Sequence, residues 1–167
     1  MIPENVDVAR LSMELDADGV AMGEVTGGLH PTLEADLIDV LNNAGSSDFG
    51  SVGMIVLDET PAATSDLRDI AQEALMQSNV ETVIVRSPHS AAVVSDVHSR
   101  ATLESGQHDL LSTWDYVHGT KLLIDDVTGS GLMGINWVLV TVIGLVALAL
   151  TIAVIAVSFR RKASLST

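Results

Sequence analysis

The sequence predicts a small α/β domain followed by one membrane-spanning helix. Apolar runs rich in β-branched residues alternate with segments whose apolar residues recur at helical spacing. The candidate strands are apolar on both faces, which is typical of a mainly parallel sheet covered by helices on both sides, a three-layer α/β/α arrangement. Near the carboxyl end, an uncharged run is long enough to cross a bilayer.

The first two helices are predicted from apolar spacing and from the residues that begin and end helices. Residues 5–18 form the first, with Asn5 as its amino-terminal cap and Gly19 as its end. The segment 20–30 is so rich in glycine that it is expected to hold only a short extended piece. A second helix is predicted over 31–45, because its apolar residues share one face and its acidic residues the other.

The next part of the chain predicts a strand–helix–strand unit. The apolar run "SVGMIVLDE" is a strand that ends at Asp58 and Glu59, and "NVETVIVRS" is a second strand of the same kind. The helix between them, "TSDLRDIAQEALMQS", should bury one stripe of residues. That stripe consists of Leu67, Ile70, Ala71, Ala74 and Leu75. A crossover of this length implies that the two strands pair in parallel.

The rest of the domain is predicted to contain a helix over 90–106 and a strand at Lys121–Ile124. The helix is predicted because Val93, Val94 and Val97 would face the core. The strand is predicted from the short apolar run in "KLLIDD". Three glycines between residues 129 and 134 mark a linker. The expected boundaries are 1–125 for the acidic domain, 126–135 for the linker, 136–159 for the membrane helix and 160–167 for a basic tail.

The run "NWVLVTVIGLVALALTIAVIAVSF" carries no charge. At ~1.5 Å rise per residue, a helix from Trp137 to Phe159 would span roughly 34 Å, more than a hydrocarbon core of ~30 Å. A helix is the solution for a single crossing, since it pairs every backbone polar group internally. Trp137 fits an anchor at headgroup level. Ala149 and Ala153 form a small-xxx-small pair through which two copies could dimerise.

The charges that flank this run predict its orientation. Arg160, Arg161 and Lys162 follow it directly, whereas the nearest basic residue before it is Lys121. Because Lys and Arg are retained on the cytoplasmic side, we expect the tail in the cytoplasm and the domain outside, in a single-pass protein of the cell membrane. The first residues show no basic or apolar part of a signal peptide, which leaves the inverted, tail-anchored arrangement as the alternative.

The domain is strongly acidic and has no cysteine. All 22 Asp and Glu precede residue 127, together with only five of the eight Lys and Arg, so this part has a formal charge of five minus 22, or −17. Such a surface repels nucleic acid and anionic headgroups, and it suits solubility or a cationic partner. Without cysteine, disulfides, thiol catalysis and zinc–thiolate sites are excluded. No Walker pattern is present, and no nucleotide cofactor is expected.

Two pairs of carboxylates suggest a metal site. Asp58 and Glu59 end one predicted strand, and Asp125 and Asp126 follow another. Ligands of open α/β sheets bind at the carboxyl ends of strands, and carboxylate oxygens suit Mg²⁺ or Ca²⁺. The plainer interpretation is that these are solvated acidic residues at strand ends, with no ligand.

The order of the predicted elements resembles that of a known family. Helix "PTLEADLIDVL", strand "GMIVLDE", helix "SDLRDIAQEAL" and strand "TVIVRS" precede a Gly-containing linker and a membrane helix. This order resembles the TPM-type domain proteins, named after a thylakoid phosphatase and widespread in bacterial envelopes. The tract 82–111 is also similar to small, uncharacterised single-pass membrane proteins of actinobacteria. These resemblances imply a setting in the bacterial envelope.

Two functions remain open. The leading hypothesis is a non-catalytic interaction or scaffold module, tethered to the lipid bilayer and bound to another envelope protein, because the sequence indicates an anchor and no reaction centre. The alternative is a metal-dependent, phosphatase-like enzyme of the TPM type that uses Asp58, Glu59, Asp125 and Asp126. Whether these four carboxylates converge in the folded domain distinguishes the two.

Overall fold

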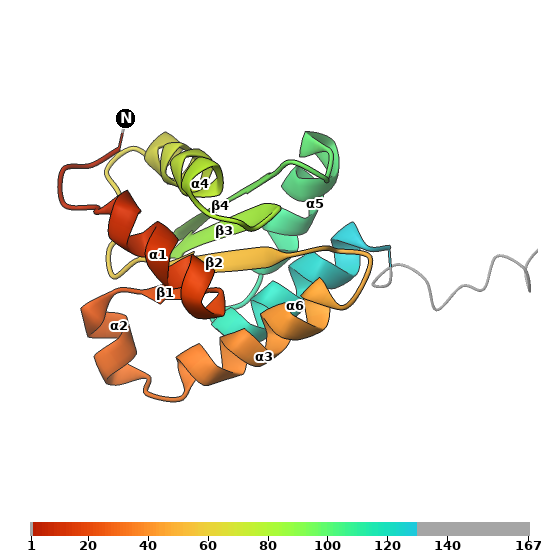
Figure 1. Cartoon of the computed structure of the whole chain (residues 1–167), viewed down its shortest axis with the longest axis horizontal. Helices are drawn as coiled ribbons and strands as arrows, with labels where there is room; N and C mark the ends of the chain where they lie inside the picture. The colour runs from red at the N-terminus through yellow and green to blue at the C-terminus, as the bar shows by residue number, and fades with distance from the viewer. Residues whose placement is uncertain (1, 130–167) are drawn as a thin grey trace, which may run out of the picture. The chain divides into compact units, whose positions relative to one another are not determined.

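A four-stranded mixed sheet organises the computed structural model, which describes residues 2–129 (Figure 1). The strands lie side by side in chain order, and their bounds are β1 Val20–Met22, β2 Val52–Val56, β3 Thr82–Ser87 and β4 Ser90–Ser95. β1, β2 and β3 pair in parallel, and β4 is antiparallel to β3. The predicted α/β class and the parallel strand–helix–strand unit are confirmed.

Helices cover both faces of the sheet. Their bounds are α1 Val8–Asp18, α2 Glu24–Leu29, α3 Leu33–Gly45, α4 Ser65–Gln77, α5 Arg100–Leu110 and α6 Tyr116–Val127. α1 and α4 pack on one face, whereas α3, α5 and α6 pack on the other. In Figure 1, α4 lies above the sheet and α3 below it.

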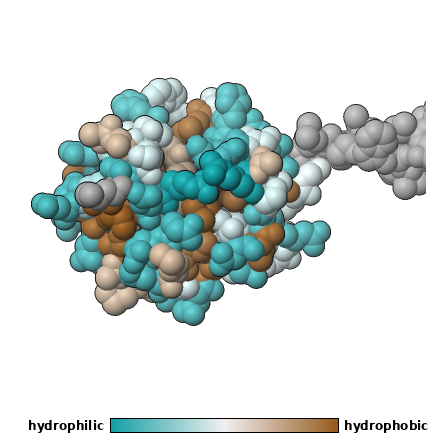
Figure 2. Space-filling view, turned by 90° about the horizontal axis from the view of Figure 1, so that it is seen from above, coloured by the Kyte–Doolittle hydropathy of each residue, from teal (hydrophilic) through white to brown (hydrophobic). Residues whose placement is uncertain are grey.

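Alternate residues of each strand build two separate apolar clusters. Ile55 and Val85 pack towards α1 and α4, and Met54 and Ile84 towards α3, α5 and α6. All five residues of the stripe predicted for α4 are buried, as expected. With these clusters enclosed, the face seen in Figure 2 is mainly hydrophilic, and its hydrophobic residues form small groups.

The two crossovers between the parallel strands lie on opposite faces of the sheet. The chain passes from β1 to β2 through α3 and from β2 to β3 through α4. Both steps move in the same direction across the sheet, while α3 and α4 cover different faces. The crossovers therefore have opposite hands, so one is left-handed, although about 98% of such connections are right-handed.

The helix predicted over 90–106 is wrong in its first half. Residues 90–95 form β4, which follows β3 through the two-residue turn of Pro88 and His89. Ala91 and Val93 face one cluster, Ala92 and Val94 the other. Because all four residues are buried, their pattern fits a doubly covered strand as well as a helix. The helix α5 begins only at Arg100.

The strand predicted at Lys121–Ile124 is wrong as well, because these residues belong to α6. Asp115 caps that helix by accepting a hydrogen bond of 2.9 Å from the backbone N–H of His118. The amino-terminal cap of α1 is Asp7, not Asn5. Gly19 ends α1 as predicted, in the left-handed conformation with φ 88°.

Candidate functional site

The carboxyl ends of β1 and β2 form a topological switch point. After β1 the chain turns through α2 towards the face that carries α3, and after β2 it turns towards the face that carries α4. When the connections of neighbouring parallel strands leave towards opposite faces, they open a crevice between them. In open α/β sheets such a crevice is where ligands bind.

A cleft of about 630 Å³ lies at this switch point. Its walls are the turn after β1, the loop after β2, the first residues of the chain and the start of α1. Carboxylates line it together with apolar side chains. The acidic lining residues are Asp7, Glu24, Asp58, Glu59 and Asp66, and the larger apolar ones are Val6, Leu11, Val25, Leu57 and Pro61.

Asp58 is the central carboxylate of this cleft, and its oxygens hold α2. Oδ1 accepts hydrogen bonds from the backbone N–H of Thr26 at 2.8 Å and from the Thr26 hydroxyl at 2.7 Å. Oδ2 accepts a third from the backbone N–H of Val25 at 3.2 Å. Asp58 thus caps a helix that lies more than 30 residues away in the chain, and its negative charge suits the positive end of the helix dipole.

These contacts shift the pKa of Asp58. Burial raises the pKa, but the Thr26 hydroxyl, the N–H groups of Thr26 and Val25, and the positive charge of Arg10 outweigh burial and hold it below the usual value. Asp58 is therefore ionised at neutral pH. It serves as an acceptor rather than as a proton donor.

The close approach of Asp58 to the turn after β1 requires glycine at position 23. A Cβ atom added to Gly23 would lie 2.3 Å from the carboxylate of Asp58, far inside any normal contact. The helix that follows has no buried residue, and Val25 and Leu29 are 62% and 71% exposed. The contact with Asp58 thus links a helix without buried residues to the end of β2.

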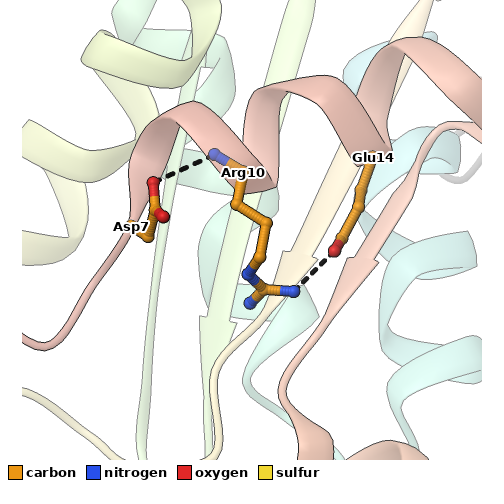
Figure 3. A network of polar contacts seen from close by, with 3 residues as sticks. All are labelled: Asp7, Arg10 and Glu14. Carbon is orange, nitrogen blue, oxygen red and sulfur yellow. Dashed lines mark hydrogen bonds and ion pairs between the residues drawn. The ribbon is translucent and has the colours of Figure 1, made fainter.

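On the other side of the cleft, α1 carries a short polar network (Figure 3). Asp7 accepts a hydrogen bond of 3.1 Å from the backbone N–H of Arg10, whose guanidinium forms an ion pair with Glu14 one turn further on. Arg10 is the only basic side chain among the described residues that line the cleft. Because its charge is paired with Glu14, the cleft as a whole is acidic.

The four predicted metal ligands lie in different places. Asp58 and Glu59 line the cleft, whereas Asp125 and Asp126 belong to the last turns of α6. Asp125 lines a separate cavity of about 450 Å³ between α3 and α6. Among residues 2–129, no three His, Asp or Glu side chains are grouped so that they could hold one metal ion. The four carboxylates therefore do not converge.

A buried arginine at the end of β3 was not predicted. Arg86 is only 3% exposed, and its guanidinium lies 4.3 Å from the centre of the Tyr116 ring. It donates hydrogen bonds to the backbone carbonyls of Thr113 and Asp115. Burial lowers the pKa of Arg86 from its ordinary, very high value, against the opposing influence of Tyr116 and Asp115. The signal in the sequence was a single cation inside the apolar run "TVIVRS".

Replacing Asp58 by Ala is expected to release α2 locally. The three hydrogen bonds would be lost, and capping interactions are worth about 0.5–2 kcal/mol. Because α2 buries nothing, the amide hydrogens of Val25 and Thr26 should exchange roughly tenfold faster, with little change in global unfolding. Amide hydrogen exchange followed by NMR measures this. Glu59→Gln, which neutralises the exposed neighbour, is the matched control and should leave α2 unchanged.

The same contact predicts a pH dependence with a definite sign. Since the pKa of Asp58 is lowered in the folded protein, its stabilisation of α2 is fully present above the unfolded value of about 3.9 and is lost as pH falls through the folded value. The amide resonances of Val25 and Thr26 should move only in that acidic range. A transition of these resonances near neutral pH would contradict the assignment.

The predicted membrane segment and its flanks, with Trp137, Ala149, Ala153, Arg160, Arg161 and Lys162, lie outside the described residues, as does most of the predicted linker. Within residues 2–129, none of the helices has the length and apolar character needed to cross a membrane.

The fold of the domain is similar to that of a solved structure. The N-terminal domain of the cg2496 protein from Corynebacterium glutamicum, determined in solution by NMR, matches with a TM-score of 0.53. The match covers 78% of this chain and 87% of that one, at 16% sequence identity. At this identity the likeness concerns the fold alone.

Sequence comparison gives a relative that matches nearly the whole chain. Membrane protein Rv1476 of Mycobacterium tuberculosis (strain ATCC 25618 / H37Rv) is 26% identical over 163 residues, which covers 98% of this chain and 83% of the relative. The profile of the family described as membrane protein Rv1476 matches residues 1–166. Neither description mentions a TPM-type domain, so that resemblance stays a prediction. Because the match extends over nearly all of its residues, the chain belongs to the Rv1476 family of membrane proteins.

Proposed function

We propose that this chain is a membrane-tethered, non-catalytic binding domain of the bacterial cell envelope, and that its binding site is the cleft at the carboxyl ends of β1 and β2. The observation that carries the proposal is the arrangement of Asp58. The carboxylate best placed to act on a ligand already accepts three hydrogen bonds from α2. The cleft is thus built around a structural contact, and the exposed side chains of Glu24 and Glu59 at its rim are the ones proposed to contact a partner.

The other side chains of the cleft support binding rather than chemistry. No His, Ser, Lys or Tyr occurs among the described residues that line it. The hydroxyl of Thr60 accepts a hydrogen bond of 3.1 Å from the backbone N–H of His89. General acid–base or nucleophilic catalysis needs a reactive group with a partner that activates it. A mixed acidic and apolar lining instead suits recognition of a polypeptide surface.

The phosphatase alternative depends on four converging carboxylates. Asp58 and Glu59 lie at the switch point, and Asp125 and Asp126 lie on α6 beside a different cavity. A hard cation needs six or more oxygen ligands, several of them supplied by the protein, at about 2.0–2.6 Å. This placement of the four residues does not favour a shared site, and we do not propose that function.

We propose further that residues 136–159 form the single membrane helix and that the tail 160–167 is cytoplasmic. Membership of a family of membrane proteins supports attachment to a membrane. The single crossing and its direction rest on the uncharged run and on the basic residues that follow it. The domain would then face the outside of the cell, with the cleft available to another envelope protein.

Site-specific photo-crosslinking in cells that produce the full chain tests the binding site. A photoreactive amino acid is placed at Glu24 or Glu59 in the cleft, and at Glu34 on α3 as the control. Each replacement removes one exposed carboxylate, so the three variants are matched in charge. We expect one discrete crosslinked product from both cleft positions and none from Glu34. Equal crosslinking from all three positions, or none from the cleft, would refute the proposal.

A further inference from the structure

The most exposed aromatic side chain of the described domain lies on a firmly held loop. Trp114 is 76% exposed. The residues on either side of it, Thr113 and Asp115, are the two whose carbonyl groups accept hydrogen bonds from the buried guanidinium of Arg86. The backbone N–H of Asp115 also donates to the Thr113 hydroxyl at 3.1 Å. The backbone around Trp114 is therefore fixed while its side chain points outward.

The start of α6 packs closely against the Arg86 side chain beneath this loop. A Cβ atom added to Gly119 would lie 2.6 Å from Nη1 of Arg86 and 2.5 Å from the carbonyl oxygen of Leu110. A buried guanidinium is costly unless it is hydrogen-bonded. The hydrogen bonds of Arg86 fix this loop, although its largest side chain, Trp114, is exposed to water. Holding that side chain in advance reduces the entropy lost when a partner binds.

Trp114 belongs to the same edge of the sheet as the cleft. Its ring and the His89 ring form a T-shaped pair, with centroids 5.8 Å apart and an interplanar angle of 89°. The backbone N–H of His89 in turn donates to the hydroxyl of Thr60, which lines the cleft. A ligand that occupies the cleft could thus extend along the loop after β2 to reach Trp114.

The charge of the domain indicates which kind of partner fits this surface. The described part of the chain holds 22 Asp and Glu against five Lys and Arg. Among aromatic side chains, Trp binds cations most strongly over its ring face. Trp is also enriched among the few residues that carry most of the binding energy at protein interfaces. An anionic membrane surface is disfavoured by the same charge that attracts a basic polypeptide.

We propose that Trp114 is the anchor of a surface that binds a Lys- or Arg-bearing segment of a partner protein, with the acidic cleft beside it receiving further basic side chains. This inference rests on the proposed binding function and specifies its partner class. The partner's cation would lie over the exposed face of the Trp114 ring. Arg86 is a positioning residue, since it touches the loop and not the partner.

Fluorescence and affinity measurements on the full chain in phosphatidylcholine nanodiscs test this. Trp137→Phe leaves Trp114 as the only tryptophan, so its emission reports on that site alone. The probe is a short peptide of alternating Arg and Ser, used near physiological ionic strength, where charges beyond ~8 Å are screened. We expect saturable binding that changes Trp114 emission. The same peptide with citrulline in place of Arg should bind at least about fivefold more weakly.

The variants separate the aromatic contact from general charge attraction. Trp114→Leu, which keeps an apolar side chain without a ring, should weaken binding by about fivefold or more, whereas Trp114→Phe should retain part of the affinity. Met13→Ala removes a side chain that is 69% exposed on α1, and it should bind as the parent does. Circular dichroism checks that each variant is folded, which an exposed position should permit.

Several results would overturn the inference. Unchanged affinity in Trp114→Leu would show that charge alone attracts the peptide, and equal binding of the citrulline peptide would exclude recognition of a cation. A change in Trp114 emission on adding phosphatidylglycerol vesicles without peptide would assign the surface to lipid. If cleft positions crosslink to a partner while these tests fail, only the role of Trp114 is refuted. If the cleft positions give no crosslinked product as well, the proposed binding function is refuted.

Discussion

Val85→Asp is expected to unfold the domain. Val85 is fully buried in the middle of β3, opposite Ile55 of β2 and Ala92 of β4. An unpaired carboxylate at this position costs several kcal/mol, whereas small domains are stable by about 5–15 kcal/mol. The variant should show no cooperative thermal transition by circular dichroism and rapid cleavage by protease.

Val97→Asp is the matched control for this substitution. Val97 is 53% exposed and follows β4, so the same change of side chain buries no charge. Its effect on the free energy of unfolding should remain within about 1 kcal/mol. Cooperative melting of Val85→Asp close to the wild-type temperature would contradict the placement of β3 at the centre of the sheet.

These two valines also show how far the sequence could predict the fold. The unit of β2, α4 and β3 was predictable because each element carries a clear signal: five stripe residues at helical spacing between two runs rich in β-branched residues. Val97 was expected to be buried on a helix and is exposed beyond β4. Four consecutive buried residues, 91–94, carry no period, so local pattern alone could not distinguish strand from helix there.

The error at β4 affected the expected site. With β4 antiparallel to β3 and no strand at Lys121–Ile124, Asp125 and Asp126 cannot lie at a carboxyl edge of the sheet beside Asp58. The position of Asp58 and Glu59 at the end of β2 followed from the sequence. The hydrogen-bond partner of Asp58 did not, because it lies in the short helix α2. The sequence predicted no regular element in this glycine-rich segment apart from a short extended piece.

The switch point could not be predicted either, because local sequence patterns do not show on which face of the sheet a crossover helix lies. It depends on α3 and α4 lying on opposite faces, which requires a left-handed crossover, and the usual preference argues against one. Right-handed crossovers throughout would have placed both helices on one face and left no crevice at this position. The cleft, and with it the proposed binding site, thus arises from the least predictable feature of the topology.

Replacing Arg160, Arg161 and Lys162 together by Asn is expected to abolish the uniform orientation of the chain in the membrane. Lys and Arg close to a membrane helix are retained in the cytoplasm, and these three stand directly after the uncharged run. Moving one elementary charge across 100 mV costs about 2.3 kcal/mol, so the triplet resists outward movement by roughly 7 kcal/mol per 100 mV. In a cell that is negative inside, the same potential favours export of the domain with its 22 acidic residues.

Protease added to intact, wall-stripped cells measures this orientation. In the parent chain the domain should be digested and a carboxyl-terminal tag spared, whereas the Asn variant should give both patterns in one population. A variant with Lys at positions 160 and 161 keeps all three charges and should behave as the parent, because the effect depends on charge and not on the arginine side chain. If the tag of the parent is cut while the domain survives, the domain is cytoplasmic. In that case the partner must be sought inside the cell.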